Sequence, residues 1–248
     1  MRKYSWIPDT PDFRDLLFEP PHIVEGLPSK VDLREKYTNV YDQGEIGSCT
    51  ANALCNAFDF VGVKEGKKPV LPSRLFLYYD ERRIEGTTGQ DAGAMIRDGA
   101  KTFHGAGVCP EFMWPYDQNL LFNQPTHDCY NHAANHRTKE YKRLNNLSLN
   151  DLKACLAAGY PFVFGFSVYE SFESDAVTKT GVVPMPKPTE RLLGGHAVLA
   201  LGYDDENKWV IVRNSWGEEW GDKGHFYLPY DYITNPNLAD DFWTIRLV

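Results

Sequence analysis

The sequence predicts an α+β protein with two lobes, because helical patterns dominate its first half and strand patterns its second. After Ser48, apolar residues recur at helical spacing through Leu54, Ala57, Phe58 and Val61. In the second half, short runs rich in Val and Phe are separated by turn residues. Helices followed by strands are typical of α+β proteins, and 248 residues suffice for two lobes that share a cleft.

The chain divides into three predicted parts. Residues 1–27 form an N-terminal extension, in which Pro8, Pro11, Pro20 and Pro21 prevent a regular helix or central strand. Residues 28–115 form a helical lobe, and residues 116–248 a β-rich lobe.

Helices are expected at four places along the chain. The first begins after Ser48, a suitable N-cap, and is predicted to end at Gly62 and Gly66. The others start at Pro72–Arg74, run near 92–103, and cover 149–158.

Strands are expected where apolar runs lie between turn residues. The predicted strands are 161–168, 196–203, 208–213, 224–228 and 242–247. The second and third are joined by Asp204-Asp205-Glu206-Asn207, which predicts a hairpin.

Composition excludes several classes of function. The formal charge is −8 and no dense Lys/Arg cluster is present, so a nucleic-acid partner is not expected. No apolar run is long enough to span a bilayer, and no signal-peptide core follows Met1. The five cysteines are too few and too scattered for a disulfide framework, although a bridge between Cys109 and Cys129 stays open.

Cys49 is the candidate nucleophile. It lies at the predicted start of the first helix, where unpaired N–H groups lower a thiol pKa, and Gly47 allows a substrate backbone to approach. The alternative is a buried structural cysteine, as expected of Cys55. Gln43, six residues earlier, can donate to an oxyanion beside the Cys49 N–H, although such a Gln can also be a turn residue.

His196 and Asn214 are the candidate base and its orienting partner. His196 begins one strand of the predicted hairpin and Asn214 closes the other, so the two can lie side by side. An Asn oxygen that accepts from one ring nitrogen fixes the imidazole, and Trp216 can shield that hydrogen bond from water. His196 alone would more simply be a core histidine, but the ordered set of Cys, His and Asn indicates nucleophilic chemistry.

Five strings resemble the papain-like cysteine peptidases over roughly residues 28–248. They are LPSKVDLREKY, QGEIGSC, GVCPEFMWPY, GGHAV and KWVIVRNSWGEEWGDKGHFYL. The resemblance implies a helical lobe and a β-barrel-like lobe, with the active site in the cleft between them. By position it makes Cys49 the nucleophile, His196 the general base and acid, Asn214 the orienting residue, Gln43 the oxyanion donor and Trp216 the shielding indole.

Two positions depart from the family pattern. Ile46 and Thr50 stand where the family usually has Cys and Trp. Ile46 cannot form the disulfide that the family has near the nucleophile, which agrees with a reducing compartment. Thr50 in place of Trp alters the wall beside the nucleophile. The family usually carries a longer inhibitory propeptide. We therefore expect residues 1–27 to pack across or near the cleft, and whether they inhibit the peptidase stays open at this point.

The resemblance also implies substrate-binding positions. Gly47 and Ser48 are expected beside the nucleophile, and the region Gly89–Gly93 is expected to hold the substrate backbone. Gly194 and Ala197 match the pocket for the side chain two before the scissile bond. The complete predicted binding set is Gly47, Ser48, Gly194, Gly195, Ala197 and Trp216.

The predicted function is therefore hydrolysis of peptide bonds through a thioester acyl-enzyme, with no cofactor and no metal. A transpeptidase or ligase that uses the same site is one alternative, and a catalytically silent papain-like binding module is another. A peptide or protein is the expected partner, without nucleic acid or membrane, and the protein is expected to be a monomer. The expected location is cytoplasmic, or exported without a visible signal peptide.

Overall fold

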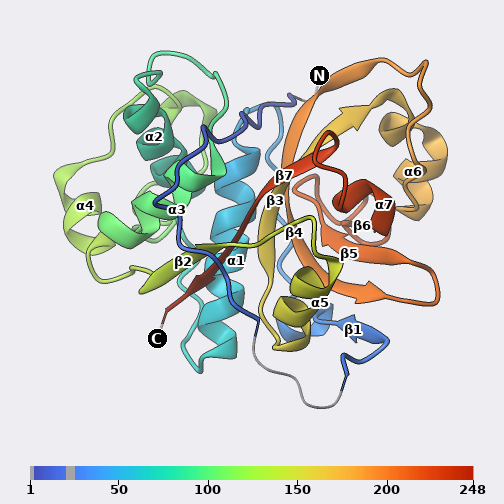
Figure 1. Cartoon of the computed structure of the whole chain (residues 1–248). Helices are drawn as coiled ribbons and strands as arrows, with labels where there is room; N and C mark the ends of the chain where they lie inside the picture. The colour runs from blue at the N-terminus through green and yellow to red at the C-terminus, as the bar shows by residue number, and fades with distance from the viewer. Residues whose placement is uncertain (1–2, 21–25, 248) are drawn as a thin grey trace.

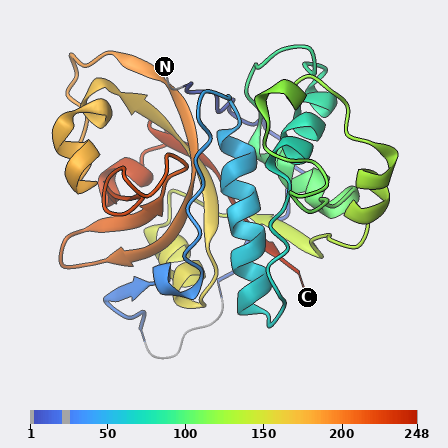
Figure 2. The same ribbon diagram turned by 180° about the vertical axis from the view of Figure 1, so that it is seen from behind.

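The computed structural model describes residues 3–20 and 26–247, and the two-lobed α+β fold is confirmed. The helices of residues 74–133 gather on one side, an antiparallel sheet with its own shorter helices lies on the other, and α1 (Cys49–Lys64) runs between them (Figures 1 and 2). Part of the predicted extension, residues 1–2 and 21–25, lies outside the described residues.

The helical side consists of α1 with α2 (Arg74–Glu85), α3 (Ile96–Gly105) and α4 (His127–Ala133). The predicted end of the first helix at Gly62 is wrong, because α1 continues to Lys64 and the glycine with positive φ is Gly66. In α2, the Ser73 side chain accepts from the Phe76 N–H as an N-cap, and Gly86 closes the helix in the left-handed region.

The third helix begins later than predicted. Gly93 has a φ of +83°, Met95 is extended, and α3 starts only at Ile96. The residues before α3 stay extended because Ala94 forms a parallel bridge with Trp6 of the N-terminal segment. A contact between segments far apart in sequence therefore sets the start of this helix.

The sheet has the strand order β2-β7-β3-β4-β5-β6, and β1 pairs with β4. Its strands are β1 (Lys30–Asp32), β2 (Glu140–Arg143), β3 (Phe162–Tyr169), β4 (Leu192–Asp204), β5 (Trp209–Arg213), β6 (His225–Pro229) and β7 (Ala239–Arg246). The last five were predicted. The two missed strands are short and polar, so they carry no apolar alternation that would reveal them.

The remaining helices are α5 (Leu149–Ala157), α6 (Asp175–Thr180) and α7 (Tyr230–Ile233), and short 3₁₀ turns cover Arg34–Lys36, Gln118–Leu120 and Glu170–Glu173. The core includes aromatic pairs within the sheet, such as Phe164 stacked on Phe242 at a centroid distance of 5.1 Å. After residue 116 the chain returns to the helical side, where Tyr130 of α4 packs on Phe76 of α2. The lobe boundary at residues 115 and 116 stays a prediction.

Residues 3–18 form a segment that crosses the junction between the helices and the sheet (Figure 1). It bridges Ala94 before α3 through Trp6, and Arg143 of β2 through Leu17. All five cysteines are free and buried. Within the described ranges, no helix is long and apolar enough to cross a bilayer.

Candidate active site

Cys49 is the first residue of α1, and its side chain is fully buried. Its N-cap, Ser48, makes no side-chain capping hydrogen bond, so the helix N-terminus keeps its positive partial charge beside the thiol. The backbone of Ala197, the residue after His196 in β4, acts to lower the pKa of the Cys49 thiol. Burial nevertheless raises the pKa of the Cys49 thiol, so the thiol is protonated in this covered arrangement.

His196 and Asn214 meet as the hairpin predicts. The His196 Nε2 lies 2.8 Å from the Asn214 Oδ1, and both residues are buried. An amide oxygen only accepts, so Nε2 carries the proton and Nδ1 is the basic nitrogen of the neutral ring. The Ser215 N–H also donates to the Asn214 Oδ1 at 2.9 Å, which fixes the orientation of that amide.

Aromatic rings enclose the imidazole. Trp216 stacks on His196 with a centroid distance of 5.0 Å and an interplanar angle of 22°. Phe166 of β3 approaches the same ring edge-on at 5.9 Å. Trp216 is 5% exposed, so it keeps water away from the His196–Asn214 hydrogen bond.

Gln43 is held by Ser215, the residue after Asn214. The Gln43 N–H donates to the Ser215 carbonyl at 2.9 Å, and the Ser215 hydroxyl donates to the Gln43 Oε1 at 2.6 Å. The side-chain oxygen is therefore occupied as an acceptor, and the amide NH₂ is directed to the loop before Cys49, where it donates to the Ile46 carbonyl at 3.0 Å. The four predicted catalytic residues thus lie in neighbouring parts of the fold: the loop before α1, the start of α1, β4 and the end of β5.

Several predicted binding residues contact the N-terminal segment. The Trp6 N–H donates to the Gly195 carbonyl at 2.9 Å, and a Cβ on Gly194 would lie 2.7 Å from that of Tyr4. Gly47 packs against Ser5, since a Cβ there would lie 3.0 Å from the Ser5 hydroxyl.

Ser48 lies deeper than the other predicted binding residues. Its hydroxyl is fully buried and hydrogen-bonded to the Tyr116 hydroxyl at 2.6 Å, so its place in the cleft wall stays a prediction.

Sequence reasoning did not identify the residues of the segment that cover the site. Ser5 Oγ lies 3.6 Å from Cys49 Sγ, and Tyr4 approaches both His196 and Trp216 edge-on. The Ser5 carbonyl accepts from the Ala94 N–H at 3.2 Å, and the Ile7 N–H donates to the Ala94 carbonyl at 3.0 Å. Ala94 directly follows the region Gly89–Gly93 that was expected to hold a substrate backbone.

Two further residues near the cleft were missed, Gly165 of β3 and Asp241 of β7. A Cβ on Gly165 would lie 2.0 Å from the Trp6 indole, and the Trp6 Nε1 donates to the Asp241 Oδ2 at 3.1 Å. The available signals were a glycine inside an apolar strand and an acidic pair at the start of another.

Charged residues anchor the segment to both the helical side and the sheet. Arg97 of α3 donates to the Asp15 carboxylate at 2.6 Å and to the Thr10 carbonyl at 2.5 Å. Asp9 accepts from the Trp243 indole at 2.8 Å, and its N–H donates to the Asp241 Oδ2 at 2.7 Å. Burial raises the pKa of Asp9; burial and the charge of Asp9 raise that of Asp241 to about 7.

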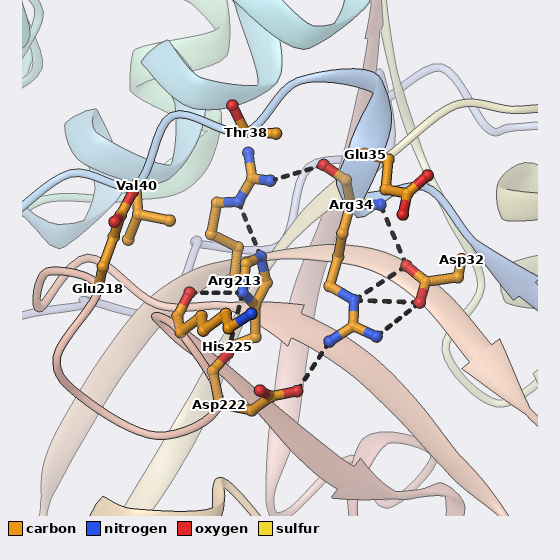
Figure 3. A pocket seen from close by; sticks show the side chains of 10 residues that line it. Asp32, Arg34, Glu35, Thr38, Val40, Arg213, Glu218, Asp222 and His225 are labelled. Carbon is orange, nitrogen blue, oxygen red and sulfur yellow. Dashed lines mark hydrogen bonds and ion pairs between the residues drawn. The ribbon is translucent and has the colours of Figure 1, made fainter.

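A cavity of about 690 Å³ lies elsewhere, between the segment 32–40 and strands β5 and β6 (Figure 3). Its buried Arg213 donates to the His225 ring at 3.1 Å, the Asn56 side chain at 2.8 Å and the Tyr37 carbonyl at 2.5 Å. Burial lowers the pKa of Arg213 to about 10. Because Asn56 belongs to α1, Arg213 joins that helix to the sheet directly before Asn214.

Known proteins resemble this chain over most of its length. Residues 27–242 match the papain family cysteine proteases. A peptidase C1-like protein of Acanthamoeba polyphaga mimivirus, itself uncharacterized, is 40% identical over 100% of this chain and 88% of its own length. Cathepsin S of Bos taurus is 31% identical over 82% of this chain, which spans about 60% of that relative.

Solved structures of cysteine proteases are also similar to this chain. Xylellain, a cysteine protease from Xylella fastidiosa, superposes with a TM-score of 0.93 at 46% identity, over 99% of this chain and 96% of its own. Procathepsin B of Trypanosoma congolense, at 17% identity and a TM-score of 0.78, shares the fold over 99% of this chain and 87% of its own. With residues 27–242 matching the family, this chain belongs to the papain family of cysteine proteases.

Proposed function

We propose that this protease hydrolyses peptide bonds with Cys49 as nucleophile, His196 as general base and acid, Asn214 as orienting residue and Gln43 as oxyanion donor. The observation that carries the proposal is the 2.8 Å hydrogen bond from His196 Nε2 to Asn214, with the Cys49 thiol influenced by the backbone of Ala197, the residue after His196. It leaves the other ring nitrogen as the base of a thiol–imidazole pair.

The reaction then proceeds in two halves. The Cys49 sulfur attacks the peptide carbonyl carbon while His196 takes the thiol proton, and the Cys49 N–H and the Gln43 amide stabilise the oxyanion. His196 returns the proton to the leaving amine and a thioester remains. Water, activated by His196, then attacks the thioester, releases the carboxylic acid and regenerates the thiol.

The segment is proposed to lower the activity of the full chain without abolishing it, because it covers the site. Cys49 and His196 are each 0% exposed, and the Ser5 hydroxyl stands at the sulfur where a substrate carbonyl would have to lie. The Ser5 carbonyl is hydrogen-bonded to Ala94 instead, so the segment offers the sulfur no carbonyl at that residue. Burial also raises the pKa of the Cys49 thiol, which keeps it in its less nucleophilic form.

The test of the catalytic assignment is the intact mass of the full chain after incubation with an epoxysuccinyl peptide. We expect one adduct on the wild type, none on Cys49→Ala, and one on Cys55→Ala, since Cys55 is a buried thiol with a pKa raised well above its usual value. An adduct that persists on Cys49→Ala would contradict the assignment. Hydrolysis of a fluorogenic peptide by the same three proteins should follow the same order.

A further inference from the structure

The Tyr116 hydroxyl joins the two parts of the chain that carry the proposed oxyanion donors. It donates to the Gln43 carbonyl at 2.9 Å and lies 2.6 Å from the hydroxyl of Ser48, the N-cap of α1. The Gln43 amide is one proposed donor, and the N–H of Cys49, the residue after Ser48, is the other. One phenol therefore contacts the backbone of the first donor residue and the side chain that precedes the second.

The direction of each hydrogen bond in this cluster follows from its partners. A carbonyl only accepts, so the single Tyr116 proton points to Gln43, and the Ser48 hydroxyl donates to the Tyr116 oxygen. The Ser48 oxygen in turn accepts from the Asn52 Nδ2 at 3.0 Å. Gln43, Ser48 and Asn52 are buried, and a buried network whose members are paired in this way is rigid. Burial raises the pKa of the Tyr116 phenol, so it keeps the proton that it donates.

Arg74, the first residue of α2, holds the cluster from one side. Its guanidinium carbon lies 3.8 Å from the centroid of the Tyr116 ring. Its Nη1 donates at 3.2 Å to the Asn52 Oδ1 and at 3.2 Å to the Asp42 carbonyl. The first of these bonds orients the amide, and the second holds the residue before the oxyanion glutamine. Glu111 pairs with the guanidinium at 2.6 Å and balances its charge.

Gln43 and Cys49 are attached to different parts of the fold. The Gln43 N–H and side-chain oxygen both bond to Ser215, beyond the end of β5, whereas Cys49 begins α1. The spacing of the two proposed donors therefore depends on contacts between these parts, and Tyr116 provides one of them. A misplacement of about 1 Å at such a site can cost about a hundredfold in rate.

We propose that Tyr116 is a positioning residue that sets the spacing of the two oxyanion donors, the Gln43 amide and the Cys49 N–H. The inference rests on the proposed function and adds a residue to it. Tyr116 acts through Gln43 and Ser48. Its hydroxyl therefore stabilises the tetrahedral intermediate indirectly, and its loss leaves the nucleophile and its base in place.

The experiment compares the full-length wild type with Tyr116→Phe, which keeps the ring on Arg74 and removes the hydroxyl. Three readouts are measured: hydrolysis of a fluorogenic peptide, inhibition by a peptide aldehyde, and alkylation of Cys49 by iodoacetamide. The thiol adds to the aldehyde carbon and its oxygen enters the oxyanion site. In alkylation the sulfur displaces iodide from a saturated carbon, so no oxyanion forms.

We expect Tyr116→Phe to lower kcat about tenfold and to raise the inhibition constant of the aldehyde by a similar factor. KM and the alkylation rate should stay within about twofold of the wild type. Tyr41→Phe is the matched control, because the Tyr41 ring lies 4.4 Å from the same guanidinium. Its hydroxyl has no hydrogen-bond partner among the residues that the structure describes, so wild-type values are expected.

A double variant separates a positioning role from a general structural one. If Tyr116 acts through Gln43, Tyr116→Phe should cost no further kcat in a Gln43→Ala background. Three results would each overturn the inference: wild-type kcat in Tyr116→Phe, an alkylation rate that falls as far as kcat, or a full tenfold loss on top of Gln43→Ala. Wild-type kcat in Gln43→Ala would instead contradict the oxyanion assignment of the proposed function, and the inference with it.

Discussion

The proposed catalytic residues and the segment that covers them are held by different kinds of contact. His196 and Asn214 lie on neighbouring strands, buried under Trp216 and joined by a 2.8 Å hydrogen bond. The segment reaches both sides of the cleft through carboxylates, main-chain hydrogen bonds and a single docked indole, while its Phe13 is 99% exposed.

From this difference we expect the site to keep its geometry when the segment leaves. The hydrogen bonds described above for His196, Asn214 and Gln43 join residues of β4, the end of β5 and the loop before α1. Displacing the segment should therefore uncover an organised site, and breaking either region alone should have separate consequences.

The largest expected effect comes from the catalytic side of this comparison. His196→Ala removes the group that transfers the proton, so kcat for a fluorogenic peptide should fall by about a thousandfold or more. His104→Ala, on the surface of α3, is the control and should retain the wild-type rate. Retention of activity in His196→Ala would show that another residue is the base.

A smaller effect should appear in the pH dependence of stability. Burial and the charge of Asp9 raise the pKa of Asp241 to about 7, against about 4 in an unfolded chain. The native state then binds more protons than the unfolded state in this window. The contribution of Asp241 to the free energy of unfolding is fully present below about pH 4 and is lost as the pH rises toward 7. Above pH 7 this contribution no longer changes.

The measurement is the melting temperature of Cys49→Ala, which cannot digest itself, at pH 5 and pH 7. We expect it to be about 4–8 °C lower at pH 7, the shift that about 2 kcal/mol produces in a protein of this size. In Cys49→Ala with Asp241→Asn the difference should shrink, although Asp9, Asp240 and Arg143 still face the site. If the melting temperatures at pH 5 and pH 7 still differ by the same amount in that variant, other titrating groups cause the pH dependence.

Most of the fold could be predicted from the sequence, because its long helices and strands have strong periodic patterns. The helix that begins at Cys49 and the hairpin that joins His196 to Asn214 were both found from spacing and turn residues. The pairing of His196 with Asn214 followed from the hairpin alone.

The segment could be predicted only in outline, because its contacts depend on tertiary structure. Trp6 and Asp241 are more than two hundred residues apart, and neither belongs to a local pattern. Ala94 stays extended where helix propensity favours a helix, because Ser5 and Ile7 occupy its backbone groups. The pocket of Gly165 and Gly195 is likewise defined by the indole that fills it.

The rate of epoxysuccinyl labelling at Cys49 tests whether an organised site lies under a removable segment. Trp6→Ala removes the docked indole and its hydrogen bond to Asp241, whereas Phe13→Ala changes an exposed ring of the same segment. We predict labelling about tenfold faster in Trp6→Ala than in the wild type, and no change in Phe13→Ala. Equal rates in all three proteins would show that the segment does not limit access to Cys49.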